Sequence, residues 1–363
     1  MEIKGARNTW SLEASVEELA LLARTAGAEV VGIITQRLER PNPAYFIGRG
    51  KLEELIELRK EVGYDLVIFD EELSPAQQRN LEREIGVKVI DRTALILDIF
   101  AKRAQTREGQ LQVELAQHEY LLPRLPHLWP HLERLGGGIG TRGPGEKQLE
   151  YDRRMIQRRI KHLKDEIESI REHRSRYRKR RSSAGIPIVA LVGYTNAGKS
   201  TLFNTLSHAG VFVEDKLFAT LDPTTRRLIL PNKQEVLLTD TVGFIQKLPP
   251  MVVEAFKATL EELNEADLLL QLIDITHKNA AEQSQTVEVL LDELGLSHKP
   301  RIMVINKIDL LTQEFGTDNE ELIERWVKRA GNNLIPVVLI SAAKGWGIKK
   351  LLNLIAEMLS ERI

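Results

Sequence analysis

Cysteine is absent from this chain of 363 residues, and no long run of apolar residues occurs in it. The first absence excludes disulfides, Cys-ligated zinc, iron–sulfur clusters and thiol nucleophiles. The second predicts no membrane-spanning helix and no membrane partner, because such a helix needs about 18 or more consecutive apolar residues. The chain starts with Met1-Glu2-Ile3-Lys4-Gly5 rather than with a basic and then apolar segment, so we expect no secretory signal. Together these absences predict a cytoplasmic protein.

The net charge is also close to zero, because the chain has 51 Lys and Arg and 52 Asp and Glu. With 42% hydrophobic residues, the composition is that of a folded protein rather than a disordered one. One segment breaks the balance: residues 153–181 contain 13 Lys or Arg and only four Asp or Glu. Such an excess favours a polyanion such as RNA as the partner of this segment. The alternative is a solvated helix face, which more often mixes charges of both signs.

The pattern along the chain predicts an α/β protein of several parts. Residues 1–91 alternate between helical and strand patterns and predict a small α/β domain. Its helices are expected at 11–26, 51–62 and 74–85, and its strands at 30–35, 66–69 and 87–90. Residues 92–181 predict an antiparallel helical hairpin, and Ser-Ser-Ala-Gly at 182–185 is the expected linker to a second α/β domain at 186–363.

The hairpin is expected to pair a helix from 92 to about 122 with a basic helix from 146 to 180. Apolar residues recur every seven positions in the basic helix, which is the pattern of a helix-packing seam. They are Leu149, Ile156, Leu163 and Ile170. The connection at 123–145 is rich in Pro and Gly and longer than a simple turn, which is typical of functional loops.

Two motif-like patterns in that connection predict no site. Gly138, Gly140 and Gly143 match GxGxxG, but no strand precedes them and no βαβ unit surrounds them, so we expect no dinucleotide site. His127 and His131 are four residues apart without a third ligand, so we expect no metal site.

Residues 186–363 predict a doubly wound, mostly parallel sheet. Strands are expected at 188–192, 227–230, 236–240, 268–274, 301–306 and 337–341. Helices are expected at 199–208, 251–264, 282–294, 319–330 and 348–359. Because ligands of such sheets bind at the carboxyl ends of the strands, a site is expected in the loops there.

A phosphate-binding loop follows the first of these strands. Residues 193–200 read Gly-Tyr-Thr-Asn-Ala-Gly-Lys-Ser, the GxxxxGKS pattern, between a buried strand and a helix. Backbone N–H groups of such a loop surround a β-phosphate at the helix N-terminus. Lys199 would reach the β- and γ-phosphates, and Ser200 would bind Mg²⁺. This pattern alone is shared by many nucleotide hydrolases.

Three further motifs narrow the nucleotide to GTP. In the motif Asp-Thr-Val-Gly at 240–243, the carboxylate can hold Mg²⁺ and the Gly243 N–H can sense the γ-phosphate. In Asn-Lys-Ile-Asp at 306–309, Asp309 can accept two hydrogen bonds from guanine, a donor pair that adenine lacks. Ser-Ala-Ala at 341–343 can offer a backbone N–H to guanine O6. We therefore expect GTP and GDP as ligands, with Mg²⁺ as cofactor.

A threonine between the first two motifs should close over Mg²⁺ and the γ-phosphate as a switch. By position, Thr220, Thr224 and Thr225 all qualify. Directly after the second motif stands Phe244, where many GTPases carry a glutamine that orients the attacking water. Phenylalanine has no donor or acceptor, so either a partner completes the site or Gln246 takes this role.

With these motifs, the chain resembles the HflX family of translational GTPases over nearly its whole length. The resemblance is carried by GYTNAGKSTLFN at 193–204, FATLDPTTR at 218–226, DTVGF at 240–244, NKID at 306–309 and the Gly-rich RLGGGIGTRGPGEKQLE at 134–150. It implies a cytosolic GTPase that binds the large (50S) ribosomal subunit, with the hairpin reaching toward 23S rRNA near the peptidyl-transferase region. It implies a role in splitting or rescuing stalled ribosomes, or in large-subunit maturation. It also favours Thr220 as the switch threonine.

The sequence thus predicts a complete set of site residues. The expected catalytic residues are Lys199, Thr220 and Gly243, and the expected Mg²⁺ ligands are Ser200, Thr220 and Asp240. The expected nucleotide-binding residues are Gly193, Tyr194, Thr195, Asn196, Ala197, Gly198, Lys199, Ser200, Thr201, Phe218, Ala219, Thr220, Leu221, Asp222, Asp240, Thr241, Val242, Gly243, Asn306, Lys307, Ile308, Asp309, Ser341, Ala342 and Ala343.

Two other functions stay open, and we expect a monomer in each case. One is an RNA-binding assembly protein in which nucleotide is mainly regulatory. The other is a signalling GTPase with protein partners, against which the basic segment argues, since phosphate backbones account for such charge better than most protein surfaces do.

Overall fold

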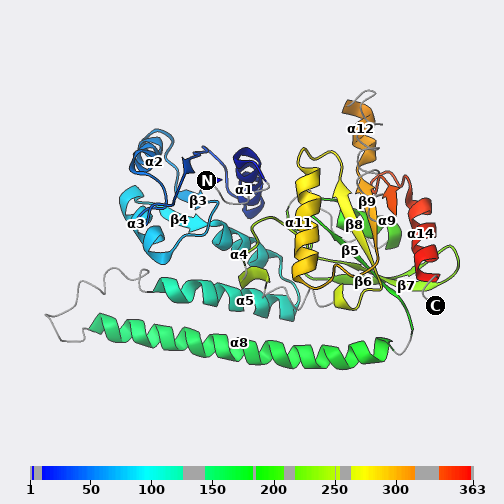
Figure 1. Ribbon diagram of the computed structural model, residues 1–363. Coiled ribbons are helices and arrows are strands. Elements are labelled where there is room, and N and C mark those ends of the chain that lie inside the picture. Colours follow the sequence, from blue (N-terminus) through cyan, green and yellow to red (C-terminus); the bar gives the residue numbers. More distant parts are fainter. Residues whose placement is uncertain are drawn as a thin grey trace. The chain divides into compact units, whose positions relative to one another are not determined.

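A computed structural model describes residues 2–3, 10–125, 144–182, 185–207, 217–249, 251–253, 263–314 and 335–360 (Figure 1). Contacts group the chain into two units. The first comprises Met1–Lys102, Gln110–Ile170 and Pro249–Ala255, and the second Arg103–Gly109, Arg171–Leu248 and Phe256–Ile363. The glycine and histidine patterns between 127 and 143 lie outside the described residues. Among the helices that are described, none is both long and apolar enough to cross a membrane.

The first unit begins with the small α/β arrangement that the sequence predicts. Its elements are β1 Glu2–Ile3, α1 Leu12–Ala26, β2 Arg37–Leu38, α2 Arg49–Val62, β3 Leu66–Phe69, α3 Pro75–Ile85 and β4 Lys88–Asp91. β3 and β4 pair in parallel, from Leu66 beside Lys88 to Phe69 beside Asp91. The side chain of Ser74 starts α3 in a capping box with Gln77. The three predicted helices and two of the three predicted strands are confirmed.

The third predicted strand, at 30–35, is wrong. This run is in no strand, and Val31 and Ile33 are 49% and 56% exposed. Strand propensity largely reflects packing against neighbouring strands rather than a preference of the backbone. Within the part of the chain that the structure describes, β3 pairs only with β4, and the β-branched run at 30–35 has no strand to pair with.

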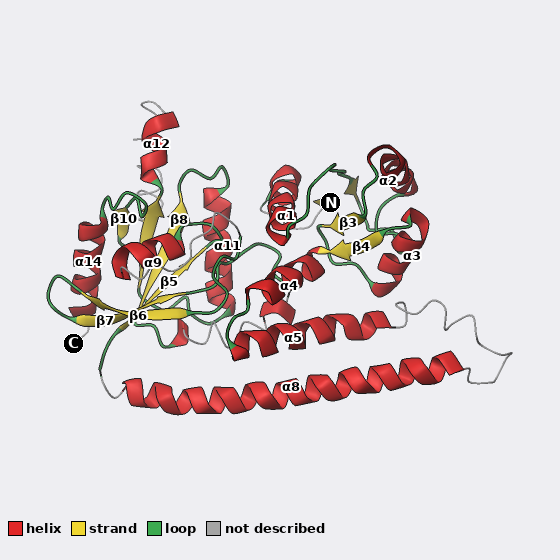
Figure 2. Ribbon diagram, turned by 180° about the vertical axis from the view of Figure 1, so that it is seen from behind, coloured by secondary structure: helices red, strands yellow, loops and turns green. Residues whose placement is uncertain are grey.

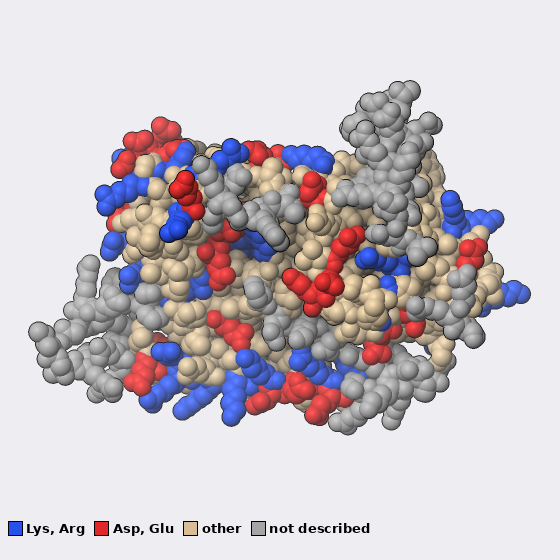
Figure 3. All heavy atoms as spheres, in the orientation of Figure 1, with Lys and Arg blue, Asp and Glu red and all other residues tan. Residues whose placement is uncertain are grey.

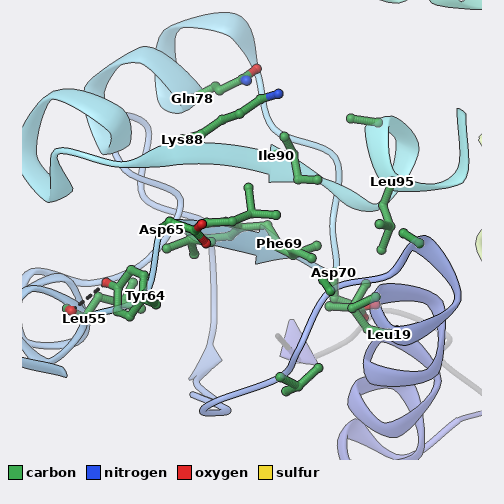
Figure 4. A pocket seen from close by; sticks show the side chains of 18 of the residues that line it. Leu19, Leu55, Tyr64, Asp65, Phe69, Asp70, Gln78, Lys88, Ile90 and Leu95 are labelled. Atoms are coloured by element: carbon green, nitrogen blue, oxygen red, sulfur yellow. Dashed lines mark hydrogen bonds between the residues drawn. The ribbon is translucent and has the colours of Figure 1, made fainter. Parts of the chain in front are cut away.

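A cavity of about 1300 Å³ opens beside β3 in the first unit (Figure 4). Apolar Leu19, Phe69 and Leu95 line it together with Asp65 and Asp70. The β-branched run that was expected to form a strand also contributes to its wall. Parallel strands are normally covered on both faces. The half-buried first three residues of β3 are therefore consistent with a hollow on one side of this strand.

The predicted helix from 92 to 122 is two helices instead of one. They are α4 Arg92–Arg103 and α5 Arg107–Leu121, followed by the short 3-10 helix η1 Leu122–Arg124. The break has a local cause, because the Thr106 hydroxyl accepts a hydrogen bond of 3.1 Å from Gly109 N. A threonine in this position caps the start of a helix, so α5 begins anew rather than continuing α4.

The predicted basic helix is confirmed as α8, Pro144–Ser182, and it runs beside α5 (Figures 1 and 2). Leu163 of the predicted seam and Ile167 are buried in one cluster with Leu111 of α5. Arg159 adds a two-pronged ion pair, at 2.7 and 2.9 Å, with Glu114 of α5. Lys164 and Arg174 likewise pair with Glu119 and Glu108 of α5, so part of the basic segment is used within the fold.

The second unit contains a six-stranded sheet in the order β10-β9-β8-β5-β7-β6. Its strands are β5 Ile188–Gly193, β6 Thr224–Ile229, β7 Glu235–Asp240, β8 Leu268–Asp274, β9 Arg301–Asn306 and β10 Val337–Leu339. Only β6 runs antiparallel to its neighbour, β7, among these six. The mostly parallel sheet predicted from the sequence is confirmed.

Helices cover both faces of this sheet (Figure 2). They are α9 Lys199–Ser207, α11 Ala280–Glu293 and α14 Ile348–Ser360, while the short α12 Ile308–Glu314 projects beyond the sheet. Phe203 of α9 and Ile355 of α14 belong to one apolar cluster, and Ala280 of α11 belongs to another. The predicted helix 319–330 and the middle of the predicted helix 251–264 lie outside the described residues.

Candidate functional site

The phosphate loop connects the end of β5 to the start of α9, and its shape requires glycine at two positions. Gly193 has φ +152° and Gly198 has φ +93°. A Cβ at Gly193 would lie 2.6 Å from the Leu272 carbonyl oxygen, and one at Gly198 would lie 2.2 Å from Asn306 Nδ2. Side chains therefore cannot replace these glycines without displacing neighbouring atoms.

Lys199 is buried at the first position of α9 and points back into the loop. Its Nζ donates hydrogen bonds to the carbonyl oxygens of Gly193 (3.1 Å) and Tyr194 (2.9 Å). Burial lowers the pKa of Lys199 to about 8, although the nearby Asp240 carboxylate opposes this shift. Burial likewise raises the pKa of Asp240 above its usual value. A buried, poorly solvated ammonium of this kind is suited to receive phosphate oxygens.

Three oxygen atoms from separate segments meet beside this lysine. Ser200 Oγ lies 2.7 Å from Thr220 Oγ1 and donates to Asp240 Oδ2 at 2.8 Å. Thr220 Oγ1 also donates to Asp240 Oδ2, at 3.0 Å. Hydroxyl and carboxylate oxygens are the ligands that Mg²⁺ accepts in phosphate sites, so this set fits the metal. The structure thus brings together the three ligands that the sequence predicts.

The other two candidate switch threonines lie elsewhere. Both Thr224 and Thr225 belong to β6, where Thr225 Oγ1 is 3.0 Å from Thr239 Oγ1 on β7. Of the three threonines, the structure therefore directs Thr220 toward Ser200 and Asp240.

Asn306 joins the two remaining loops of the site. Its Nδ2 donates to the Ala197 carbonyl oxygen at 2.9 Å, and its Oδ1 accepts from Ala342 N at 3.0 Å. Next to it, Lys307 has φ +67° and forms an ion pair of 2.7 Å with Asp274 at the end of β8. The phosphate loop, the motif at 306–309 and the motif at 341–343 are thus tied together.

The segment after β7 is bonded to the phosphate loop. Thr195 N donates to the Phe244 carbonyl oxygen at 2.7 Å, and Phe244 N donates to the Gly193 carbonyl oxygen at 3.1 Å. Gln246 N donates to the Tyr194 hydroxyl at 2.8 Å. The Phe244 ring is buried. This hydroxyl contact is not foreseen by the sequence motifs, in which Tyr194 occupies a variable position.

Asp222 is one of the predicted nucleotide-binding residues, and its carboxylate contacts a segment that is distant in the sequence. Its carboxylate accepts hydrogen bonds from Gln105 N (2.7 Å), Thr106 N (2.9 Å) and Thr106 Oγ1 (2.5 Å). The carboxylate therefore binds the segment between α4 and α5 within the second unit. Sequence reasoning missed Thr106, although a threonine followed by an acidic residue two positions later is a helix-start signal.

The other predicted residues lie along the same loops. In the segment after β7, a Cβ on Gly243 would lie 2.9 Å from Thr195 Cα, so only glycine leaves room there. Asp309 lies in the first turn of α12. The remaining ones are Asn196, Thr201, Phe218, Ala219, Leu221, Thr241, Val242, Ile308, Ser341 and Ala343.

Three family models match consecutive parts of the chain. They are described as GTP-binding GTPase N-terminal over residues 13–101, GTP-binding GTPase middle region over 103–181, and 50S ribosome-binding GTPase over 188–307. Among solved structures, a GTP-binding protein of the archaeon Sulfolobus solfataricus in complex with GDP is 28% identical, with a TM-score of 0.51 and 97% of each chain covered. A GDP complex of a protein called SsGBP is 29% identical, with a TM-score of 0.54 and 95% of each chain covered.

Two curated relatives carry the name GTPase HflX. The GTPase HflX of Caldanaerobacter subterraneus is 59% identical over 76% of this chain, and the chain spans 64% of that protein's length. The GTPase HflX of Escherichia coli is 47% identical over 96% of this chain and 80% of that protein. The similarity covers the small α/β arrangement, the helical hairpin and the phosphate loop alike, and the chain belongs to the HflX GTPase family.

Proposed function

We propose that this protein binds GTP with Mg²⁺, hydrolyses it to GDP and phosphate, and acts on the large ribosomal subunit in the cytoplasm. The observation that carries the proposal is the meeting of the Ser200, Thr220 and Asp240 oxygens beside the phosphate loop. The names of its relatives, GTPase HflX, and the description of the matching model, 50S ribosome-binding GTPase, support it.

Phosphate binding follows from the loop and its lysine. The N–H groups at the start of α9 point to where phosphates would lie, and the helix dipole favours negative charge there. Lys199 Nζ would exchange its two carbonyl partners for phosphate oxygens, which are charged and therefore stronger acceptors. Ser200, Thr220 and Asp240 would hold Mg²⁺, which supplies charge neutralisation at the phosphates.

Guanine would be selected by Asp309, whose carboxylate can accept hydrogen bonds from N1–H and the 2-amino group. Asn306 does not need to touch the base for this selection. Through its bonds to Ala197 and Ala342, it holds the base-binding loops against the phosphate loop. A nucleotide whose base presents an acceptor in place of these donors would leave the carboxylate unpaired.

Hydrolysis requires a water in line with the γ-phosphate, and the described residues that follow β7 supply little to orient it. The Phe244 side chain is buried and has no polar atom. Gln246 is also buried, with its backbone held by Tyr194. The Gly243 N–H can contact the γ-phosphate but cannot abstract or direct a proton. We infer that the large subunit completes the catalytic arrangement.

The basic part of α8 supports contact with RNA. Figure 3 shows Lys and Arg side chains along this helix, with acidic ones among them. Arg153, Arg158 and Lys161 are exposed there, whereas Arg159 pairs with Glu114. Neutralising phosphates with such exposed cations releases counterions and favours binding. We propose 23S rRNA as this polyanion, in ribosome splitting and rescue or in large-subunit maturation.

Sedimentation with purified 50S subunits tests the proposal. The protein is expected to sediment most strongly with a non-hydrolysable GTP analogue and least with GDP, since the switch at Thr220 is expected to close only over a γ-phosphate. Equal sedimentation with GTP, GDP and no nucleotide would favour the second candidate, an RNA-binding assembly protein with regulatory nucleotide. Absence from the 50S fraction in every case would contradict the ribosomal function.

A further inference from the structure

Asp222 uses its carboxylate to hold the segment that separates α4 from α5. Oδ2 accepts from two successive backbone nitrogens, Gln105 N at 2.7 Å and Thr106 N at 2.9 Å. Oδ1 accepts from the Thr106 hydroxyl at 2.5 Å. Three charge-assisted donors on one carboxylate form a strong and geometrically specific contact. The contact lies wholly within the second unit, which includes residues 103–109.

The contact also sets the start of α5. The Thr106 hydroxyl that donates to Asp222 accepts in turn from Gly109 N, at 3.1 Å. A Cβ at Gly109 would lie 2.4 Å from Asp222 Oδ1, so the close approach of the carboxylate depends on glycine there. One residue before it, Glu108 pairs with Arg174 of α8 at 2.9 Å. The first turn of α5 is therefore bonded both to the segment after Thr220 and to α8.

The place of Asp222 in the chain connects this contact to the metal-binding oxygens. Thr220, two residues earlier, has its hydroxyl against Ser200 and Asp240. Leu221 between them is 3% exposed, so the short link is anchored in the protein interior. A movement that takes Thr220 away from Ser200 and Asp240 must pull on Asp222, because only one residue separates them.

We propose that Asp222 is a positioning residue that reports the state of the Thr220 switch to the α4–α5 junction. With Thr220 drawn in over Mg²⁺ and a γ-phosphate, Asp222 holds residues 105 and 106 and orients the Thr106 hydroxyl that caps α5. When the γ-phosphate is lost, Thr220 is released, Asp222 withdraws, and the Thr106 cap of α5 loses this support. This inference rests on the proposed GTP binding. It adds the contacts through which loss of the γ-phosphate would change the structure outside the nucleotide site.

Thermodynamic linkage between the contact and the nucleotide predicts the direction of a measurable change in relative affinity for a GTP analogue and GDP. If GTP favours the Asp222 contact, the contact must favour GTP over GDP by the same factor. Loss of the contact should therefore weaken binding of a GTP analogue relative to GDP by about fivefold or more, the lower end of ordinary coupling. A residue with a merely structural role would lower stability without changing this ratio.

The test has two readouts on the full chain. The first is hydrogen exchange of the amides of residues 105–109 in the unaltered protein. Exchange is expected to be about tenfold slower with guanosine 5′-O-thiotriphosphate than with GDP, since the amides of 105 and 106 are hydrogen bonded only in the first state. Equal exchange in the two nucleotide states overturns the inference without the need for any variant.

The second readout is the ratio of dissociation constants for GDP and the GTP analogue, measured by calorimetry. Asp222→Ala removes all three hydrogen bonds and should lower the ratio about fivefold. Thr106→Val removes only the hydroxyl bond and should lower the ratio by less, and the double variant should lower it no further than Asp222→Ala does, because both changes act on one contact. Thr106→Ser keeps the hydroxyl and should keep the ratio. Glu293→Gln, an exposed charge change on α11, is the matched control.

The outcomes distinguish failure of the role of Asp222 from failure of the proposed function. Binding of both nucleotides with an unchanged ratio in Asp222→Ala and Thr106→Val overturns the role of Asp222 and leaves the proposed function intact. Additive losses in the double variant overturn it as well. No binding of either nucleotide by the unaltered protein overturns the proposed function, and this inference with it.

Discussion

The phenolic oxygen of Tyr194 accepts a hydrogen bond of 2.8 Å from the backbone nitrogen of Gln246. Both residues are buried, at 3% and 5% exposure. The bond joins the phosphate loop to the segment after β7, next to two backbone hydrogen bonds that involve Phe244. The position of Gln246 is therefore fixed in part by the phosphate loop.

Tyr194→Phe keeps the ring and removes the hydroxyl that accepts from the buried Gln246 N–H. We expect a loss of about 1–3 kcal/mol in the free energy of unfolding. We also expect slower GTP turnover on 50S subunits, with little change in GDP affinity. Tyr64→Phe is a matched control, because it removes a hydrogen bond of 2.6 Å to the Leu55 carbonyl oxygen in the first unit. Similar turnover by the two variants would contradict a positioning role for Tyr194.

Guanine selection by Asp309 predicts a change of base preference. Asp309→Asn should weaken GTP binding by about 1.5–3 kcal/mol, the range for a lost charged hydrogen-bond pair. The asparagine amide can donate, so the variant should gain affinity for xanthosine triphosphate, whose base has an oxygen where guanine has the amino group. Competition between the two nucleotides in an equilibrium titration measures the shift. Unchanged affinity for both nucleotides would remove Asp309 from the site.

The lowered pKa of Lys199 predicts a pH dependence of nucleotide binding. Burial brings this pKa to about 8 in the protein without nucleotide. Phosphate oxygens near Nζ would raise the pKa, so the bound state takes up a proton near and above that pH. Affinity should therefore be highest below it and fall as the pH rises through it. Calorimetry in buffers of different ionisation enthalpy measures the proton uptake, and Lys199→Met should abolish it together with most of the affinity.

The basic part of α8 predicts a salt-dependent interaction with the large subunit. Arg153→Glu with Arg158→Glu should weaken 50S binding and reduce its dependence on salt concentration, because fewer counterions are released. GTP affinity of the free protein should not change. Lys349→Glu with Lys350→Glu makes the same charge change on α14, where both side chains are exposed, and serves as the control. Equal effects of the two double variants would mean that only total charge matters.

The sequence predicts much of this site because its motifs are local. Gly193, Lys199 and Ser200 follow one strand in one short pattern, and a buried parallel strand is recognisable from its apolar run alone. The contacts that it does not predict join distant segments: Asp222 to Thr106, and Tyr194 to Gln246. The strand prediction for 30–35 is wrong for a related reason. Its β-branched residues favour a strand, but they do not show whether a partner strand lies beside them.

GTP turnover with and without 50S subunits tests the central claim most directly. The buried Phe244 cannot orient water, so the free protein should hydrolyse GTP slowly, and saturating 50S subunits should raise the rate by at least about tenfold, the scale expected when a partner completes a phosphoryl-transfer site. Gln246→Ala should leave most of that stimulation in place. Equal rates with and without 50S subunits would contradict activation by the ribosome, and a loss of turnover in Gln246→Ala alone, among otherwise folded variants, would assign the chemistry to that side chain.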